Sequence, residues 1–357
     1  MPFSKERILP HATPVPTITT TAITASTVRA TRRVAVLASV SGISSGYWRD
    51  GRIPGSRNRR ARLVIVPARV VITGAAGQVG RFLAGEAARR GHDVSALTHR
   101  QWDITDPDAA QRFVAAGDLV VNCAALTNVD DAEADPDAAY AINAVGPENV
   151  AHACARVGAR LVHVSTDYVF SGEQRHPYDI GDQTGPLSVY GRTKLAGERN
   201  VLAAMPDATI VRTSWVYTGG EGNDFVAVMR RRAASDGTVA VADDQTGSPT
   251  YVKDLVNALF EVGEGRISEP ILHVANAGAC SRFEQARAVF EELGADQRRV
   301  RPVSSGQVAR RAPRPAYSAL SMTTSVRAGL TPPRPWRVAL AEALAQPAGG
   351  GQLPSTP

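Results

Sequence analysis

The stretch RVVITGAAGQVG, residues 69–80, decides the fold of this 357-residue chain. Its first five residues are an apolar, β-branched run, and residues 77–90 continue as an amphipathic helix. Three glycines, Gly74, Gly77 and Gly80, lie at the turn between them. Glycines in such a turn let the backbone approach a pyrophosphate, which the N–H groups at the helix N-terminus can bind. We therefore expect a dinucleotide-binding loop, although a tight turn without a ligand fits the same residues.

Outward from this stretch, buried-strand patterns alternate with helical patterns. Further strands are expected at 93–97, 118–122, 160–165 and 208–213, with helices near 106–116, 132–157 and 188–205. Near-continuous apolar strands separated by helices are typical of a parallel sheet covered on both faces. The predicted fold class is α/β, a Rossmann-type doubly wound parallel sheet.

The pattern also predicts how the chain divides into domains. A Rossmann domain is expected over 69–212, with return elements near 236–262. Beyond residue 213 the pattern is mixed and proline-rich, which predicts a smaller, discontinuous substrate domain over 213–235 and 263–345. The tail, 346–357, is expected to be disordered.

Residues 1–68 differ from the rest in charge and pattern. They hold 11 Lys and Arg against 2 Asp and Glu, so the net charge of +6 arises from this segment and the remaining chain is slightly acidic. Their Arg-, Ser- and Thr-rich composition resembles an organelle transit peptide. The interpretation we favour is a disordered or spurious N-terminal extension, with Val66 as an alternative start. Because the basic residues are confined there, no nucleic-acid partner is expected.

Composition argues against several other classes. No apolar run approaches the ~18 residues of a membrane span, so no membrane partner is expected. The three cysteines, Cys123, Cys154 and Cys280, are widely spaced, which argues against a disulfide framework and indicates reduced thiols in a cytoplasmic protein. No histidine or acidic cluster indicates a catalytic metal.

The residues after the second expected strand bear on which nicotinamide cofactor is bound. That strand ends at Leu97, and Arg100 follows in place of the acid that would bind the ribose hydroxyls of NADH. An arginine can pair with the 2′-phosphate of NADPH, so NADPH is favoured and NADH stays possible. An exposed surface arginine is the alternative interpretation. Asp103 and Ile104 are candidate contacts for the adenine ring.

Tyr190 and Lys194 stand at positions i and i+4 of an expected helix, on one face. The pair is informative because the whole chain has only three lysines. A phenol with a pKa of about 10 is a poor acid or base at neutral pH. A nearby ammonium favours the phenolate and lowers that pKa, and it can also hold the nicotinamide ribose. An ordinary helix pair is the alternative.

Two further strand ends carry candidate residues. Thr166 follows the strand expected at 160–165, and its hydroxyl is placed to bond a substrate carbonyl, because ligands of doubly wound sheets bind at the carboxyl ends of strands. Capping of the strand end is the alternative. Trp215, after the next strand, is interpreted either as a surface on which a sugar or base stacks or as core. His163 and His273 are expected to be core residues.

Eight motifs together resemble the extended short-chain dehydrogenase/reductase superfamily and, within it, the dTDP-4-dehydrorhamnose reductases. They lie in order along the chain: TGAAGQVG (73–80), DITD (103–106), NCAALTNVDDAE (122–133), STDYVFSG (165–172), YGRTKLAGE (190–198), RTSWVY (212–217), DDQTGSPTY (243–251) and RPAYSAL (314–320). The resemblance implies that NADPH delivers hydride to the C4 ketone of dTDP-4-dehydro-L-rhamnose, the last step of dTDP-rhamnose biosynthesis. Tyr190 would donate the proton, Lys194 would tune it and bind ribose, and Thr166 would polarise the ketone.

The resemblance also implies which residues bind the two ligands. Thr166, Asp167 and Trp215 match positions that hold the nucleotide sugar. Ala124 is small enough for backbone to lie beside a cofactor. The expected cofactor contacts also include the residues of the glycine loop, which are Gly74, Gly77, Gln78, Val79 and Gly80. The resemblance places three more beside the nicotinamide ribose: Ala125, Leu126 and Thr127.

Several alternatives stay open at this point. Some members of the family form a magnesium-linked dimer through acidic residues that cannot be placed in this chain, so Mg²⁺ and the choice between monomer and homodimer are undecided. Tyr168 stands where the related nucleotide-sugar dehydratases carry Glu, which disfavours a dehydratase. Another nucleotide-sugar epimerase or reductase is an alternative. So is a non-catalytic NADP-binding regulatory subunit like the β subunit of methionine adenosyltransferase, although the intact Thr166, Tyr190 and Lys194 favour an enzyme.

Overall fold

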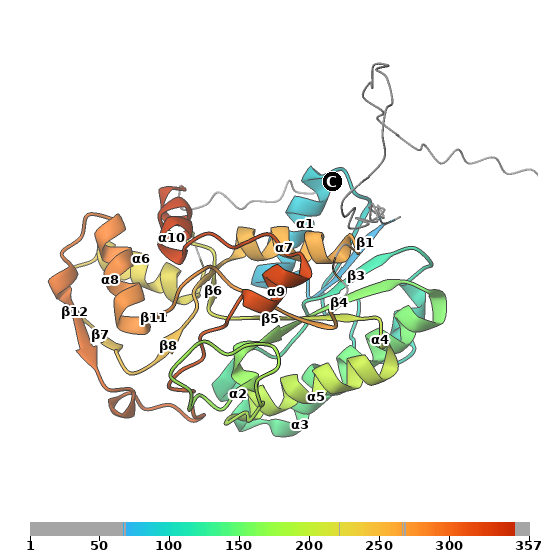
Figure 1. Ribbon diagram of the computed structural model, residues 1–357, viewed down its shortest axis with the longest axis horizontal. Coiled ribbons are helices and arrows are strands. Elements are labelled where there is room, and N and C mark those ends of the chain that lie inside the picture. The colour runs from blue at the N-terminus through green and yellow to red at the C-terminus, as the bar shows by residue number, and fades with distance from the viewer. Residues whose placement is uncertain (1–66, 68, 221, 266, 268, 347–357) are drawn as a thin grey trace, which may run out of the picture. The chain divides into compact units, whose positions relative to one another are not determined.

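The computed structural model describes residues 67, 69–220, 222–265, 267 and 269–346. The extension 1–68 expected from the sequence lies outside them apart from residue 67, and so does all of the tail 346–357 except residue 346. The described residues contain a six-stranded sheet with helices on both faces (Figure 1). A doubly wound α/β fold is therefore confirmed.

The strands of this sheet are all parallel and follow the order β10-β5-β4-β3-β1-β2. Their bounds are β1 Val70–Thr73, β2 Val94–Leu97, β3 Leu119–Asn122, β4 Arg160–Thr166, β5 Thr209–Thr213 and β10 Ile271–Val274. The chain first builds outward from β1 to β2 and then returns to add β3 on the other side. The carboxyl ends of β1 and β3 therefore flank the point where strand order reverses, which is where doubly wound sheets bind ligands.

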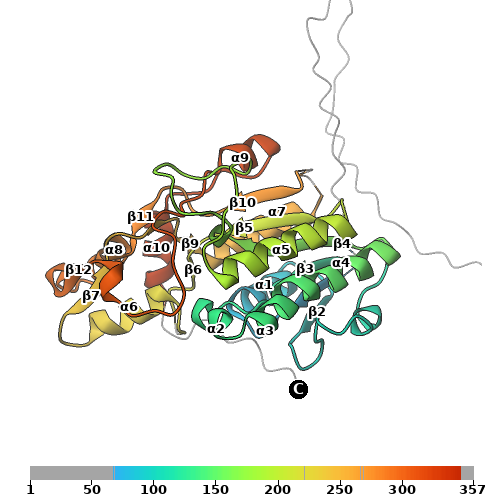
Figure 2. The same cartoon turned by 90° about the horizontal axis from the view of Figure 1, so that it is seen from below.

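Side chains of the central strands point alternately to the two helical layers. In β1, Val70 and Ile72 pack with α1 and α7, whereas Val71 packs with α4. Helices α1 (Gln78–Arg89) and α7 (Val252–Gly263) cover one face. Helices α4 (Gly146–Val157) and α5 (Val189–Ala204) lie side by side on the other, as the view from below shows (Figure 2). Burial on both faces explains why the strands are apolar without alternation.

Two helices expected from the sequence differ in the structure. The stretch 106–116 holds only a 3₁₀ turn at Ala109–Arg112. The stretch 132–157 is interrupted and begins earlier, as α2 (Val129–Ala134), α3 (Pro136–Tyr140), a π-helical segment at Ala141–Val145, and α4. Proline disfavours helical backbone in the residue before it, and Asp135 has φ −135° and ψ 82°. Asp135 therefore ends α2, and its side chain caps α3 by accepting a hydrogen bond from Ala138 N.

Most of the chain between residues 216 and 345 lies outside the six-stranded sheet, and only α7 and β10 within this range join it. The elements outside it are β6 (Val216–Tyr217), α6 (Phe225–Ala234), β7 (Val239–Ala242), β8 (Thr246–Gly247), β9 (Thr250–Tyr251), β11 (Cys280–Ser281), α8 (Arg282–Glu292), β12 (Val300–Val303), α9 (Thr323–Ala328) and α10 (Trp336–Ala345). Strands β7 and β12 pair in parallel, and α6 packs on α8. The returning strand β10 joins the sheet beside β5, beyond the stretch near 236–262 from which return elements were expected.

Candidate active site

The glycine loop between β1 and α1 has the close packing that its residues predict. Gly74 has φ +63°, and a Cβ there would lie 2.7 Å from Ala124 N. A Cβ on Gly80 would lie 2.4 Å from Gly74 O, so α1 begins directly against the loop. Gly77 is the N-cap of α1 and has no side chain to cap it. The first N–H groups of α1 are thus left to other acceptors, as a pyrophosphate site requires.

The ends of β1 and β3 are tied together behind this loop. Thr73 Oγ1 donates to Asn122 Oδ1 at 2.6 Å, and Asn122 Oδ1 also accepts from Ala124 N at 3.2 Å. Asn143 holds the following residues by accepting from Leu126 N at 2.8 Å and donating to Leu126 O at 3.1 Å. The segment 124–127, for which cofactor contacts are expected, is therefore fixed beside the glycine loop.

Helix α5 carries the predicted catalytic pair, and its start is firmly held. Ser188 caps the helix by accepting from Gly191 N at 3.2 Å. A Cβ on Gly191 would lie 2.2 Å from Tyr168 O, so α5 rests directly on the backbone that follows β4. This contact brings Tyr190 close enough to Thr166 for the Thr166 hydroxyl to influence the pKa of the phenol. Thr166 Oγ1 itself donates to Asp167 Oδ1 at 3.1 Å. The edge of the Tyr190 ring also meets the Tyr168 ring, with centroids 5.7 Å apart at 74°.

The pKa of Tyr190 lies above its ordinary value. Burial is the main cause, and it outweighs the hydrogen bond to Thr166, which lowers the pKa. The sequence expectation that Lys194 lowers this pKa is wrong for the protein without ligands. The raised pKa leaves the phenol protonated at neutral pH but makes it a weaker acid, so proton donation needs a positive charge that stabilises the tyrosinate.

Lys194 is 2 % exposed and is held from the sheet side. Its Nζ donates to Val164 O at 2.8 Å and lies 3.3 Å from His163 Nε2. Burial lowers the pKa of Lys194 to about 8, against the opposing influences of Glu198 and Cys123. His163, fully buried and with a pKa well below its ordinary value, is neutral, and its Nδ1 lies 3.1 Å from Asn122 Nδ2.

A buried ion pair lies one helical turn beyond Lys194. Arg212 on β5 meets Glu198 through Nη2 to Oε2 at 2.7 Å, and Ser165 Oγ donates to Glu198 Oε1 at 2.5 Å. Both side chains are almost fully buried, at 4 % and 2 % exposure. This pair fixes α5 to the carboxyl ends of β4 and β5 and thereby fixes the spacing of the catalytic pair from the sheet.

Two residues expected to bind the sugar, Asp167 and Trp215, are each held by a defined contact. Ser214 donates to Asp167 at 3.0 Å, and burial raises the pKa of Asp167 to about 6. Trp215 has φ +48° and is the one non-glycine residue with positive φ among those that the structure describes. Its ring lies under the guanidinium of Arg282, 3.5 Å away. Such a backbone conformation costs energy and is found mostly where function requires it.

The expected adenine side is less defined by the structure. Arg100 is exposed at the end of β2, and Asp103 accepts hydrogen bonds from Thr105 N and Oγ1 at 3.0 and 2.8 Å. Ile104 is 4 % exposed and faces the core, where a Cβ on Gly146 would lie 2.6 Å from its Cδ1. The roles of these three residues stay predictions.

Sequence reasoning missed other residues near the site. Arg282 and Glu198 carry charge next to the predicted residues, and His163, interpreted only as core, contacts Lys194. Glu198 stands four residues after Lys194, as Lys194 does after Tyr190, and this spacing was a usable signal. No comparable signal marks Arg282, because only the fold brings α8 to Trp215.

A metal-binding cluster and a membrane-spanning helix are both absent from the part of the chain that the structure describes. Within it, no group of three or more His, Cys, Asp or Glu is arranged to hold a metal ion. None of the helices described there is both long enough and apolar enough to cross a membrane.

A glycine loop at the switch point of a doubly wound sheet, with Tyr190, Lys194 and Thr166 beside it, defines a nicotinamide-dependent oxidoreductase of the extended short-chain dehydrogenase/reductase class. Comparison with known proteins narrows this class. Residues 68–348 match the family model described as the RmlD substrate binding domain. The chain is 59% identical over 320 residues to dTDP-4-dehydrorhamnose reductase of Mycolicibacterium smegmatis, covering 88% of this chain and 98% of that protein.

Two more comparisons agree. The chain is 60% identical over 296 residues to dTDP-4-dehydrorhamnose reductase of Mycobacterium tuberculosis strain H37Rv, covering 81% of this chain and 97% of that protein. The crystal structure of the Bacillus anthracis dTDP-4-dehydrorhamnose reductase in complex with NADP superposes with a TM-score of 0.72 at 37% identity, covering 78% of this chain and 98% of that one. The chain belongs to the dTDP-4-dehydrorhamnose reductase family.

Proposed function

We propose that this protein reduces the C4 ketone of dTDP-4-dehydro-L-rhamnose with hydride from NADPH and so forms dTDP-L-rhamnose. The observation that carries the proposal is the placement of Tyr190 and buried Lys194 on one face of α5, next to Thr166 at the carboxyl end of β4. Membership of the reductase family, at 59% identity to the Mycolicibacterium smegmatis protein, supports the substrate. It does not favour the alternative of a regulatory subunit.

The cofactor site fits a nicotinamide dinucleotide. The closeness of Gly74 and Gly80 to the neighbouring backbone leaves no room for side chains, and the uncapped start of α1 offers free N–H donors. We place the pyrophosphate over Gly74, Gly77, Gln78, Val79 and Gly80, and the nicotinamide ribose beside Lys194 and the segment 124–127. When bound, NADPH supplies the hydride.

The chain's own residues then handle the proton and the developing charge. Thr166 Oγ1 donates to Asp167 Oδ1 at 3.1 Å in the structure and lies near the Tyr190 hydroxyl. By turning its proton to a bound carbonyl oxygen, Thr166 would polarise that oxygen together with Tyr190. As hydride reaches the carbon, negative charge develops on that oxygen, and Tyr190 gives up its proton to it. The tyrosinate that remains is stabilised by the Lys194 ammonium. Lys194 therefore acts as an ammonium in this step, although burial holds its pKa at about 8.

On the substrate side, Asp167 and Trp215 are proposed to hold the nucleotide sugar, as the family resemblance implies. Arg282 adds a charge that suits a diphosphate. Its guanidinium is packed between the rings of Trp215 and Phe225, at 3.5 and 4.8 Å from the ring centroids. Burial lowers its pKa to about 10, so it stays a cation at neutral pH.

NADPH is preferred over NADH in this proposal because Arg100 is exposed at the end of β2, where a 2′-phosphate would lie. The NADP bound in the Bacillus anthracis structure supports the same choice. Arg100→Ala should weaken NADPH binding about tenfold, the effect of about 1.4 kcal/mol, and leave NADH binding unchanged. Equal NADPH affinity in the variant would show that Arg100 is only a surface residue.

The remaining features of the proposal follow from the sequence. We propose a cytoplasmic enzyme that acts as a monomer or homodimer, and its three cysteines are free thiols in the structure.

Absorbance of NADPH tests the reaction directly. Purified protein should oxidise NADPH when dTDP-4-dehydro-L-rhamnose is added, and Tyr190→Phe should abolish turnover while it binds NADPH with nearly unchanged affinity. NADPH binding by the wild type without turnover of any dTDP-ketosugar would support the regulatory-subunit interpretation instead.

A further inference from the structure

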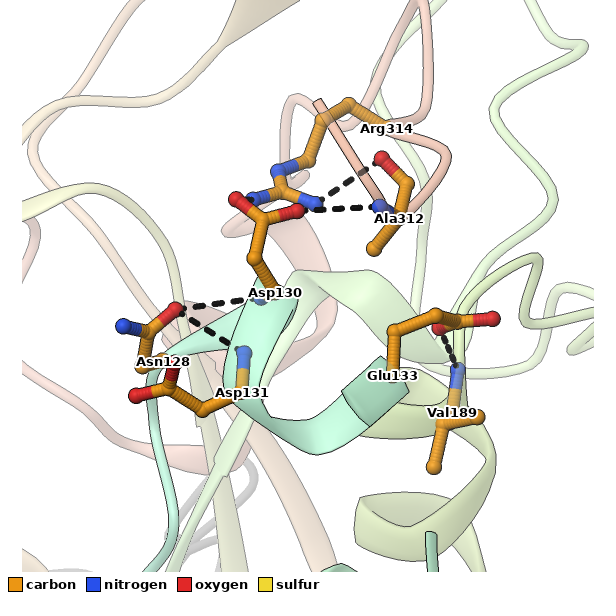
Figure 3. Close-up of polar contacts among 7 residues, drawn as sticks. All are labelled: Asn128, Asp130, Asp131, Glu133, Val189, Ala312 and Arg314. Carbon is orange, nitrogen blue, oxygen red and sulfur yellow. Dashed lines mark hydrogen bonds and ion pairs between the residues drawn. The ribbon is translucent and has the colours of Figure 1, made fainter. Parts of the chain in front are cut away.

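A carboxylate on α2 holds a loop from the far end of the sequence. Asp130 Oδ1 accepts from Ala312 N at 2.9 Å, and Asp130 Oδ2 accepts from Arg314 Nη2 at 2.9 Å (Figure 3). Arg314 also donates to Ala312 O at 3.0 Å, and its side chain is only 11 % exposed. One carboxylate therefore fixes both the backbone and a side chain of the loop 310–314.

The same helix is tied to the start of the catalytic helix. Asn128 caps α2 by accepting from Asp130 N and Asp131 N at 3.0 and 3.3 Å. At the other end of α2, Glu133 accepts from Val189 N at 2.9 Å (Figure 3). Val189 immediately precedes Tyr190, so a short helix links the loop 310–314 to the residue expected to donate the proton.

The loop brings positive charge to the substrate side of Tyr190. The chain that follows the loop lies beside the residues after Tyr168, because Tyr317 N donates to Gly172 O at 3.2 Å. In keeping with this geometry, the charges of Arg282, Arg314 and Arg310 each act on Tyr168, whose ring packs against Tyr190. Arg314 is neutralised by Asp130, whereas Arg310 is exposed on the same loop. Arg282 forms no ion pair within 4.0 Å among the residues that the structure describes. Arg282 instead stacks on Trp215 and Phe225 and donates to Gln285 Oε1 at 3.1 Å, and the charge of Arg310 also acts on Asp130. Both cations still lack a carboxylate in ion-pair contact among the described residues, so they can meet a dianionic group.

We propose that Asp130 is a positioning residue that holds the loop 310–314 so that Arg310, together with Arg282, binds the diphosphate of the nucleotide sugar. The identity of that ligand rests on the proposed function. The position of the loop does not, because it follows from the two contacts of Asp130. An Asp130 that served only to stabilise the fold would not act through Arg310, and this difference can be measured.

The test is calorimetric titration with dTDP, which carries the diphosphate and needs no turnover. Asp130→Ala should weaken dTDP binding about fivefold, because the loop that carries Arg310 loses both of its contacts with Asp130 and must be ordered when the ligand binds. This ordering cost opposes the gain from removing a negative charge that acts on Arg310. NADPH affinity should stay unchanged. Asp131→Ala is the matched control, because Asp131 lies on the same turn of α2 and points away from Ala312 and Arg314 (Figure 3).

A double-mutant cycle separates positioning from stability. Arg310→Ala should weaken dTDP binding, and the double variant with Asp130→Ala should bind no more weakly than Arg310→Ala alone. Additive effects, or wild-type affinity in Asp130→Ala, would overturn the proposal. Asp130→Asn, which keeps the acceptor for Ala312 N, should bind with intermediate affinity even if the alanine variant is unstable, and wild-type affinity there would also count against the proposal.

The outcomes distinguish this inference from the proposed function. If the wild type binds dTDP but reduces no dTDP-ketosugar, the proposed reaction fails and the cycle still decides the role of Asp130. If the wild type does not bind dTDP, the assignment of Arg310 and Arg282 to a diphosphate is itself wrong.

Discussion

The pH dependence of the reaction should report the environment of Lys194. Its pKa of about 8 is set by burial, with Glu198 and Cys123 opposing. The ammonium fraction then falls from about nine-tenths at pH 7 to about one-tenth at pH 9. If the ammonium is the active form, kcat/KM should fall about tenfold per pH unit above about pH 8. Steady-state rates of NADPH oxidation between pH 6 and pH 10 measure this limb.

Besides burial, the contact with His163 should influence where that limb lies. Asn122 Oδ1 accepts from Ala124 N, so its Nδ2 faces His163 Nδ1, which must accept. The ring proton is then on Nε2, only 3.3 Å from Lys194 Nζ, where an N–H opposes an ammonium. His163→Gln can place an acceptor oxygen there instead. It should move the alkaline limb upward by about one pH unit, which corresponds to about 1.4 kcal/mol.

A second buried histidine provides the control. His273 lies on β10, is fully buried, and contacts Ser321 O with Nδ1 at 3.2 Å. His273→Gln should change stability but leave the alkaline limb in place. If His163→Gln lowers kcat with an unshifted limb, or if both variants shift it equally, the proposed influence of His163 on Lys194 is refuted.

Three other changes test separate parts of the structure. Glu198→Ala leaves Arg212 buried without its carboxylate, so it should lower the free energy of unfolding by about 3–5 kcal/mol in a denaturant titration, and an unchanged midpoint would contradict this. Gly80→Ala forces a Cβ to within 2.4 Å of Gly74 O, so NADPH binding measured by fluorescence should weaken more than tenfold; Gly181→Ala, which meets no atom within 4 Å, is the control. Trp215→Ala should raise KM for the nucleotide sugar about tenfold with a smaller change in kcat, and the reverse pattern would place Trp215 in the chemical step rather than in binding.

The central sheet could be predicted because its signal is local. Each of the five strands predicted from the sequence is a short, mainly apolar run, and the structure has a strand at each. The edge strand β2 is the least buried of them. The prediction of one helix over 132–157 was wrong because single residues decide where helices begin and end. Asn128 caps α2 and Asp135, just before Pro136, ends α2 and caps α3, whereas the spacing of apolar residues is read over many positions and does not detect such breaks. Strand β10 was not recognised because Ile271–Val274 is a short run with a histidine in it and lies in a proline-rich region, and its place in the sheet depends on pairing with β5, which is 58 or more residues earlier.

The site divides in the same way. The spacing of Tyr190 and Lys194 predicts that they share one face of a helix, and the structure has both on α5. Thr166 was expected where the strand at 160–165 ends, and it is the last residue of β4. The raised pKa of Tyr190 could not be foreseen, because it depends on how deeply α5 packs against β4. Asp130 and Arg314 are 184 residues apart, and only the fold makes them partners.

The transfer of deuterium tests the central claim most directly. NADPH labelled with deuterium at the transferred position is incubated with dTDP-4-dehydro-L-rhamnose and the protein, and the product is examined by NMR. Hydride delivery to the ketone predicts dTDP-L-rhamnose with deuterium on C4, formed by the wild type and absent with Tyr190→Phe. Deuterium at another carbon, or none in a product that forms, would contradict reduction at C4 by this site.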